Sequence, residues 1–114
     1  MREQRVAVPL EPVPDVYIAR GVLLLPETKT VAMALAKQLR REGLATVVAT
    51  QRSLKGQMRH ANALRVKYVV IIDADGLGEL PEPVVQVRRM EDGAQSEVPL
   101  TQVAAYLLQA LGKA

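Results

Sequence analysis

Residues 45–72 read ATVVATQRSLKGQMRHANALRVKYVVII, and this segment has the clearest structural signals in the chain. A short β-branched run over 45–50 opens it, and a nearly continuous apolar run over 66–72 closes it, with Lys67 as the one charged residue. Both runs are typical of strands, and the second is typical of a strand covered on both faces. Ser53 stands where a helix N-cap belongs. The stretch therefore predicts a strand–helix–strand unit with parallel strands and a right-handed crossover.

The predicted helix between these strands has two distinct faces. Its apolar stripe recurs at helical spacing and is expected to face the sheet. The members of that stripe are Leu54, Met58, Ala61 and Leu64. Lys55, Arg59 and Asn62 follow one another at i, i+4 and i+7, away from the stripe, so they are expected to share one exposed face.

The segment before this unit adds another strand and helix. Prolines make residues 1–13 an extended N-terminal segment. The apolar residues 16–25 predict a strand, with a bulge or turn at Gly21. Thr28 or Thr30 is expected to cap the following helix at its N-terminus. That helix should end at Gly43 in the left-handed conformation that glycine favours.

The segment after the unit is less regular. Asp73–Gly78 has the composition of a turn or loop. Val84–Arg89 predicts a fourth strand, and Glu91–Gly93 a hairpin turn into a short fifth strand around Ser96–Val98. Leu100–Leu111 has the apolar spacing of a helix. The whole predicts an α/β protein: one three-layer α/β/α domain over 14–114 with a mixed five-stranded sheet.

Composition narrows the possible functions. The 114 residues contain no cysteine, which excludes disulfides and thiolate metal sites. No apolar run approaches the ~20 residues of a membrane span, so a cytoplasmic location is expected. Phe and Trp are absent and three Tyr are present, which argues against an aromatic platform for single-stranded RNA. Residues 43–72 contain five basic and no acidic side chains, an asymmetry that can mark a polyanion-binding face.

Five segments, in their order and spacing, resemble the anticodon-binding domain of class IIa aminoacyl-tRNA synthetases, most of all the C-terminal domain of the histidyl type. They are Leu39–Leu44, Gln51–Ala61, Tyr68–Ile72, Glu91–Gln95 and Val103–Leu108. The resemblance implies that the sheet and the second helix present polar side chains to an anticodon loop. It also implies a freestanding paralog that is no enzyme, because 114 residues leave no room for a synthetase catalytic domain.

The resemblance implies RNA contacts at Arg52, Lys55, Gln57 and Arg59, with the loop around Glu27 nearby. The residues themselves add Asn62, on the same helix face as Lys55, and Ser53, whose helix N-terminus offers donors to an anion. The expected partner is tRNA or another structured RNA. The plainer alternative is that these are ordinary solvated helix residues.

Two other functions remain open. The chain is alternatively an accessory subunit or homodimer that has lost RNA recognition, using a strand edge within Val84–Val98 or the Tyr106 side of the last helix. A small-molecule or enzymatic role at the strand-end loops ranks last, because no catalytic set converges there. Asp73 and Asp75 are more typical of a solvated loop than of a metal site, and no cofactor is expected.

Three further side chains have plain structural interpretations. His60 is the single histidine, so it cannot form a zinc site or a nucleophile triad and is expected to be a helix residue near the basic face. Met33 and Met58 are expected to fill the core.

Overall fold

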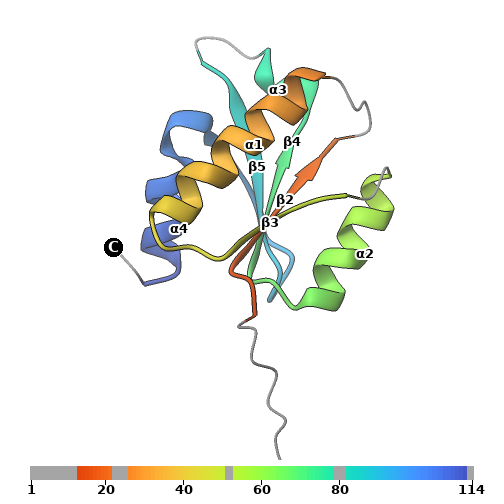
Figure 1. Cartoon of the computed structure of the whole chain (residues 1–114), viewed down its shortest axis with the longest axis vertical. Helices are drawn as coiled ribbons and strands as arrows, with labels where there is room; N and C mark the ends of the chain where they lie inside the picture. Colours follow the sequence, from red (N-terminus) through yellow and green to blue (C-terminus); the bar gives the residue numbers. More distant parts are fainter. Residues whose placement is uncertain (1–12, 22–25, 51–52, 79–81, 113–114) are drawn as a thin grey trace, which may run out of the picture.

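The structure is a computed structural model, which describes residues 13–21, 26–50, 53–78 and 82–112. A five-stranded mixed sheet forms its centre (Figure 1). The strands are β2 (Val16–Arg20), β3 (Thr46–Val48), β4 (Tyr68–Ile72), β5 (Val84–Arg89) and β6 (Gln95–Pro99). Their spatial order is β3-β2-β4-β5-β6. The first three of these are parallel, and the β4–β5 and β5–β6 pairs are antiparallel, so the predicted fold class is confirmed.

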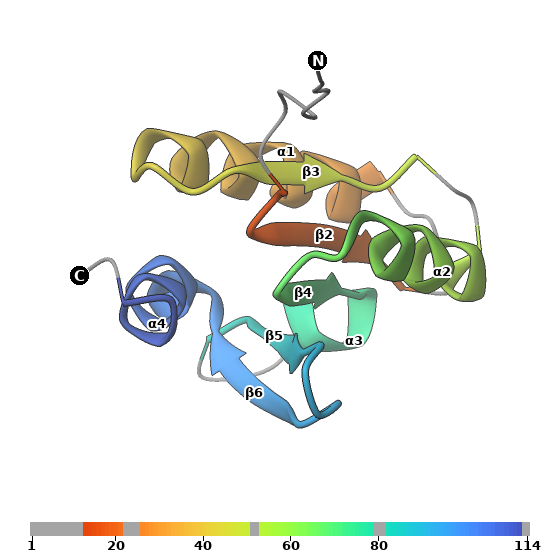
Figure 2. The same ribbon diagram turned by 90° about the horizontal axis from the view of Figure 1, so that it is seen from below.

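Helices lie on both faces of this sheet. In the described ranges they are α1 (Pro26–Arg41), α2 (Leu54–Leu64), α3 (Ala74–Leu77) and α4 (Val103–Ala110), the last preceded by the 3-10 helix η1 (Leu100–Gln102). Figures 1 and 2 show α1 and α4 on one face of the sheet and α2 on the other. The two faces are therefore unequally covered.

Two apolar clusters follow from this arrangement. The larger lies beneath α1 and α4 and includes the fully buried Leu39, Ile72 and Leu107. The smaller lies beneath α2, where Tyr17, Val69 and other strand side chains pack. The predicted inner stripe of α2 is confirmed: Ala61 is buried, and Leu54, Met58 and Leu64 are partly buried against the smaller cluster.

The end of α1 forms as the sequence predicts. Gly43 has φ +91°, in the left-handed region. Its N–H donates to the Arg40 carbonyl, and the Leu44 N–H donates to the Leu39 carbonyl, both at 3.0 Å. This pair of hydrogen bonds is the Schellman motif, and it turns the buried Leu44 back onto the core beside Leu39.

Three predictions about local structure are wrong. The predicted caps Thr28 and Thr30 lie inside α1, which begins two residues before Thr28. The segment predicted as a loop contains α3, because the Asp73 carboxylate accepts a hydrogen bond from the Gly76 N–H at 2.7 Å and so caps a short helix. Met33 is 52% exposed rather than in the core.

Gly21, where a bulge or turn was predicted, continues the pairing of β2 with β4, and a close approach of the two strand ends explains the glycine. The Gly21 N–H donates to the Ile72 carbonyl at 2.7 Å, which continues the β2–β4 ladder in register. A side chain at this position would meet Asp73, so glycine is required by a close approach. Residues 22–25, the predicted continuation of the strand, and residues 1–12 lie outside the described ranges.

Candidate nucleic-acid interface

Helix α2 begins at the carboxyl ends of the parallel strands. Ser53 has extended backbone angles (φ −90°, ψ 148°), and its hydroxyl accepts a hydrogen bond from the Gly56 N–H at 2.9 Å. Ser53 is therefore the N-cap that the sequence predicts. The cap fixes the first turn of α2 at the edge of the sheet where α/β proteins tend to bind their ligands.

The outer face of α2 presents polar side chains to solvent. Lys55, Arg59 and Asn62 are all exposed, whereas Ala61 on the inner side is fully buried. Each of the three is exposed, as the predicted face requires, and their contact with RNA stays a prediction. An Arg can donate two parallel hydrogen bonds to a phosphate or a guanine edge, and a Lys supplies a compact positive charge.

Gln57 lies inside the protein, so the prediction that it contacts RNA is wrong. Its side chain is 0% exposed. The amide oxygen accepts from the Arg20 backbone N–H at 2.6 Å, and the amide nitrogen donates to the Arg20 carbonyl at 3.0 Å. Helical spacing was a signal that could have found this, because Gln57 comes three residues after Leu54 and four before Ala61, within the apolar stripe.

Two of the predicted contact residues cannot be assigned a geometry. Arg52 lies outside the described ranges, as does the side chain of Glu27. Both stay predictions from the sequence.

His60 occupies the flank of α2 between the inner and outer faces. Its Nδ1 is hydrogen-bonded to the Tyr17 hydroxyl at 2.9 Å, and the two rings meet edge to face with centroids 5.3 Å apart. Burial raises the pKa of the Tyr17 hydroxyl above its ordinary value. His60 is a helix residue, as predicted, and its half-buried ring joins α2 to β2, a contact that the sequence analysis did not predict.

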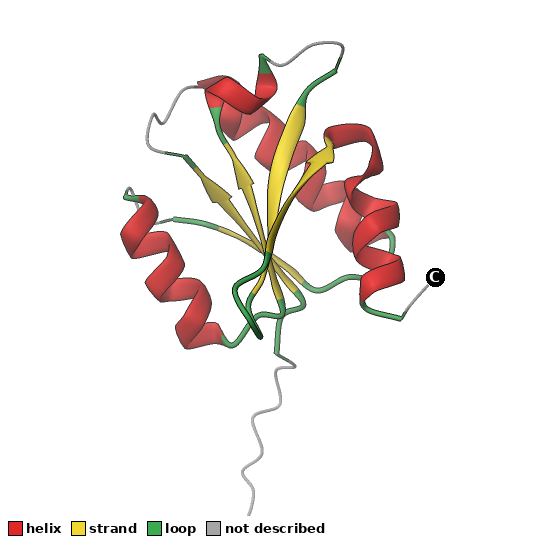
Figure 3. Ribbon diagram, turned by 180° about the vertical axis from the view of Figure 1, so that it is seen from behind, coloured by secondary structure: helices red, strands yellow, loops and turns green. Residues whose placement is uncertain are grey.

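One face of the β5–β6 hairpin is left open by the helices that the structure describes. Val85, Val87 and Val98 are buried under α4 and its neighbours. Side chains alternate along a strand, so the residues next to these valines on β5 and β6 point to the opposite face of the sheet, the one that carries α2. Figure 3 shows α2 standing to one side of the strands, with α1 and α4 on the other.

The open hairpin face is polar. Its side chains include Gln86, Arg88, Gln95 and Glu97. The amide nitrogen of Gln86 donates to the Glu97 carboxylate, and the amide oxygen of Gln86 accepts from the Gln95 amide, each at 3.4 Å. The three side chains therefore form a hydrogen-bonded chain. These residues were missed at the sequence level. The alternation of Val85 and Val87 with polar neighbours was the signal that could have found them.

The hairpin turn is held by an ion pair. Arg89 and Asp92 are joined by two hydrogen bonds, of 3.0 and 2.6 Å. The bonds from Arg89 lower the pKa of the Asp92 carboxyl to about 2, and the Asp92 carboxylate raises the pKa of Arg89. Gly93 follows at φ +76°, as the predicted turn requires.

The basic residues of the acid-free segment that the structure describes do not form one continuous patch. Lys55, Arg59, Arg65 and Lys67 are all exposed. Lys55 and Arg59 lie on α2, whereas Arg65 and Lys67 follow the helix and lie at the opposite end of the sheet, where β4 begins. The candidate interface therefore consists of the outer face of α2 and the open hairpin face.

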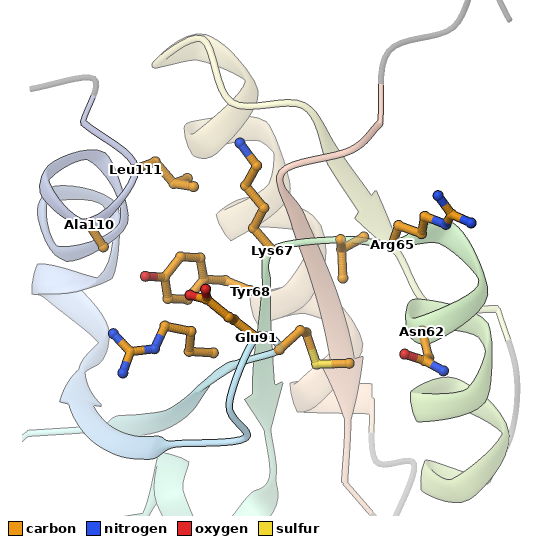
Figure 4. A pocket seen from close by; sticks show the side chains of 10 residues that line it. Asn62, Arg65, Lys67, Tyr68, Glu91, Ala110 and Leu111 are labelled. Atoms are coloured by element: carbon orange, nitrogen blue, oxygen red, sulfur yellow. The ribbon is translucent and has the colours of Figure 1, made fainter.

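A hollow of about 570 Å³ opens at that opposite end, between α2, β4 and α4 (Figure 4). In Figure 4 the side chains of Arg65 and Lys67 point away from each other and from Tyr68. Charged groups that diverge do not hold a small anion in a fixed place. We therefore assign no ligand to this hollow.

Within the described ranges, no group of three or more metal-ligating side chains is brought together. No helix in the same ranges has the length and apolar character needed to cross a membrane.

One known protein family matches most of this chain. The sequence pattern of the family described as "Anticodon binding domain" matches residues 19–110 of this chain. That span contains every strand and helix of the sheet sandwich apart from the start of β2. The chain belongs to this family of anticodon-binding domains.

Its relatives within the family include histidine–tRNA ligases. The ligase of Pyrococcus furiosus is 36% identical over 103 residues, which are 87% of this chain and 23% of the ligase. The ligase of Pelotomaculum thermopropionicum is 38% identical over 109 residues, which are 94% of this chain and 24% of the ligase. The chain thus spans about a quarter of the length of these relatives and is related to their anticodon-binding domain.

Solved structures agree with this fold. The histidyl-tRNA synthetase of S. aureus without ligands superposes with a TM-score of 0.73 at 23% identity, over 90% of this chain and 25% of the synthetase. The enzyme from Nostoc sp. PCC 7120 gives a TM-score of 0.72 at 21% identity, over 87% of this chain and 22% of that enzyme.

Proposed function

We propose that this chain binds tRNA or a tRNA-like RNA, without catalysing aminoacylation itself, through the outer face of α2 and the open hairpin face. The observation that carries the proposal is the exposed row of Lys55, Arg59 and Asn62 on a helix whose N-terminus stands at the strand carboxyl ends. Membership of the anticodon-binding family supports RNA as the polyanion.

The two surfaces suit different parts of an RNA loop. Lys55 and Arg59 supply the charge that binds phosphates. Gln86 and Gln95 supply amide donors and acceptors that can bond to the edges of unpaired bases. Arg88 stands beside them, and its Nε is buried without a hydrogen-bond partner among the described residues. The absence of aromatic rings on both surfaces means that hydrogen bonding and charge, rather than stacking, supply the affinity.

A salt titration of total-tRNA binding tests the proposal. Lys55→Ala/Arg59→Ala should weaken binding and reduce the slope of log affinity against log salt by about 1.4 to 1.8 units, as expected for two lost phosphate contacts. The matched control is Lys29→Ala/Lys37→Ala, which removes the same charge from exposed positions of α1 on the other face of the sheet. Equal losses in the two variants would mean non-specific attraction, and absence of binding by the wild-type chain at low salt would refute RNA binding.

A protein-interaction role is the second candidate. β6 lies at the edge of the sheet, while β5 is paired on both sides, so the predicted pairing edge is confined to β6. Tyr106 on α4 is 37% exposed. Sedimentation over a range of concentrations tests self-association, and a strict monomer would count against pairing through β6.

A further inference from the structure

β3 is shorter than β2, the strand with which it pairs. β2 bonds to β3 through alternate residues: the Val16 N–H donates to Ala45, and the Ile18 carbonyl accepts from Ala49. By the same alternation, the backbone N–H and C=O of Arg20 point toward β3. β3 ends at Val48, which pairs with Ile18, so Arg20 extends beyond the reach of its neighbour.

Gln57 occupies the place of the missing strand residue. Its amide oxygen accepts from the Arg20 N–H, and its amide nitrogen donates to the Arg20 carbonyl. A carboxamide carries the same donor and acceptor as a peptide group, so one side chain completes the β2 ladder. Burial at 0% exposure means that neither water nor another partner can readily replace it.

These two bonds also fix α2. Gln57 lies between Lys55 and Arg59 in the first turns of that helix, and its amide can bond Arg20 only if those turns stand directly over the end of β2. Arg20 is in turn joined to α1, because its Nε donates to the Thr28 hydroxyl at 3.0 Å. Arg20 therefore links α1 and α2 across the carboxyl end of the sheet.

We propose that Gln57 is the positioning residue of the RNA interface: by extending the sheet with its side chain, it holds Lys55 and Arg59 where an RNA backbone can contact both. This proposal rests on the proposed function. Gln57 does not touch RNA, and its effect on binding passes through the two basic side chains.

The test begins with the protein alone. Gln57→Met keeps the length of the side chain and removes both hydrogen bonds. Hydrogen exchange at the Arg20 amide should accelerate about tenfold or more, as loss of a buried hydrogen bond implies, while the Gly21 amide, bonded to β4, changes less. Unchanged protection at Arg20 would overturn the proposal whatever the RNA results are.

RNA binding is measured next, with total tRNA and at a temperature where every variant is folded. Gln57→Met should lower affinity about three- to tenfold in the wild-type background. In the Lys55→Ala/Arg59→Ala background it should have little further effect, because the groups it positions are gone. Leu108→Ala, which shortens a partly buried side chain of α4, is the control for general destabilisation and should leave affinity unchanged.

Gln57→Glu provides a rescue and a second variant should Gln57→Met fold poorly. A protonated carboxyl has one donor and one acceptor, so at low pH it can make both bonds to Arg20, whereas the carboxylate cannot donate. Relative to wild type at each pH, Arg20 protection and RNA affinity should both recover as the pH falls. Altered exchange with unaltered affinity would refute the positioning role and leave RNA binding standing. Absence of RNA binding by wild type would refute both.

Discussion

Replacing Gly21 with alanine should destabilise the protein at the edge of the sheet where RNA is proposed to bind. A Cβ at this position would lie 2.5 Å from the Cβ of Asp73 and 3.3 Å from its Cα. Ordinary carbon–carbon contacts are about 3.5–4.0 Å, so the ends of β2 and β4 would have to separate by roughly 1 Å. The hydrogen bond from Gly21 to Ile72 joins those same ends and would be strained with them.

The expected magnitude comes from two opposing terms. Overpacking of this kind costs about 1–3 kcal/mol. The lower entropy of alanine in the unfolded chain returns about 0.4–1 kcal/mol. The midpoints of the two ranges give a net loss of about 1.3 kcal/mol. Each kcal/mol corresponds to about 4 °C in Tm, because the entropy of unfolding is roughly 2.1 cal/mol/K for each of the 114 residues.

Urea and thermal denaturation followed by circular dichroism measure this loss. Asp73→Gly removes the atom that the new methyl group would meet, so Gly21→Ala should cost less in that background than alone. The reasoning is refuted if Gly21→Ala leaves stability unchanged or raises it, or if the two substitutions are additive.

Three further predictions concern α2 and the hairpin turn. Ser53→Ala removes the cap of α2 and should cost about 1 kcal/mol in urea denaturation, whereas an unchanged midpoint would mean that the cap contributes nothing. NMR titration should give the Asp92 carboxyl a pKa of about 2 instead of 3.8, so its contribution to stability is present above about pH 4 and is lost as the pH falls through 2. Arg89→Ala should return that pKa to its ordinary range, and a normal value in the wild type would contradict the ion pair. Tyr17→Phe, which removes the bond to His60, should cost about 0.5–1.5 kcal/mol in the same denaturation assay, and no loss would show that the bond is not stabilising.

Most of the fold could be predicted because its elements have strong local signals. The continuous apolar run of β4 predicts a strand buried on both faces. The glycine after α1 predicts the end of that helix, and the serine before α2 predicts the N-cap of the next one. The α3 segment was missed because Asp and Gly favour loops on average. In this chain the Asp73 carboxylate caps a short helix instead, a hydrogen bond that composition does not reveal.

The candidate interface was less predictable. Lys55, Arg59 and Asn62 could be grouped because helical spacing determines which side chains share a face. Gln57 was misplaced because the family resemblance was followed although helical spacing puts this residue in the apolar stripe with Leu54 and Ala61. Its hydrogen-bond partner, a backbone group 37 residues away, has no local sequence signal. The hairpin face is open because α2 covers other strands of the sheet. The position of a helix over a sheet is a tertiary feature, which the local sequence pattern does not predict.

The most direct test of the central claim is to map where RNA touches the protein. We would titrate ¹⁵N-labelled protein with total tRNA and follow the backbone and side-chain amide signals. RNA binding as proposed predicts the largest shifts at Lys55 to Asn62 and at the side-chain amides of Gln86 and Gln95, with α1 and α4 little affected. Shifts confined to α1 and α4, or spread evenly over the surface, would contradict it.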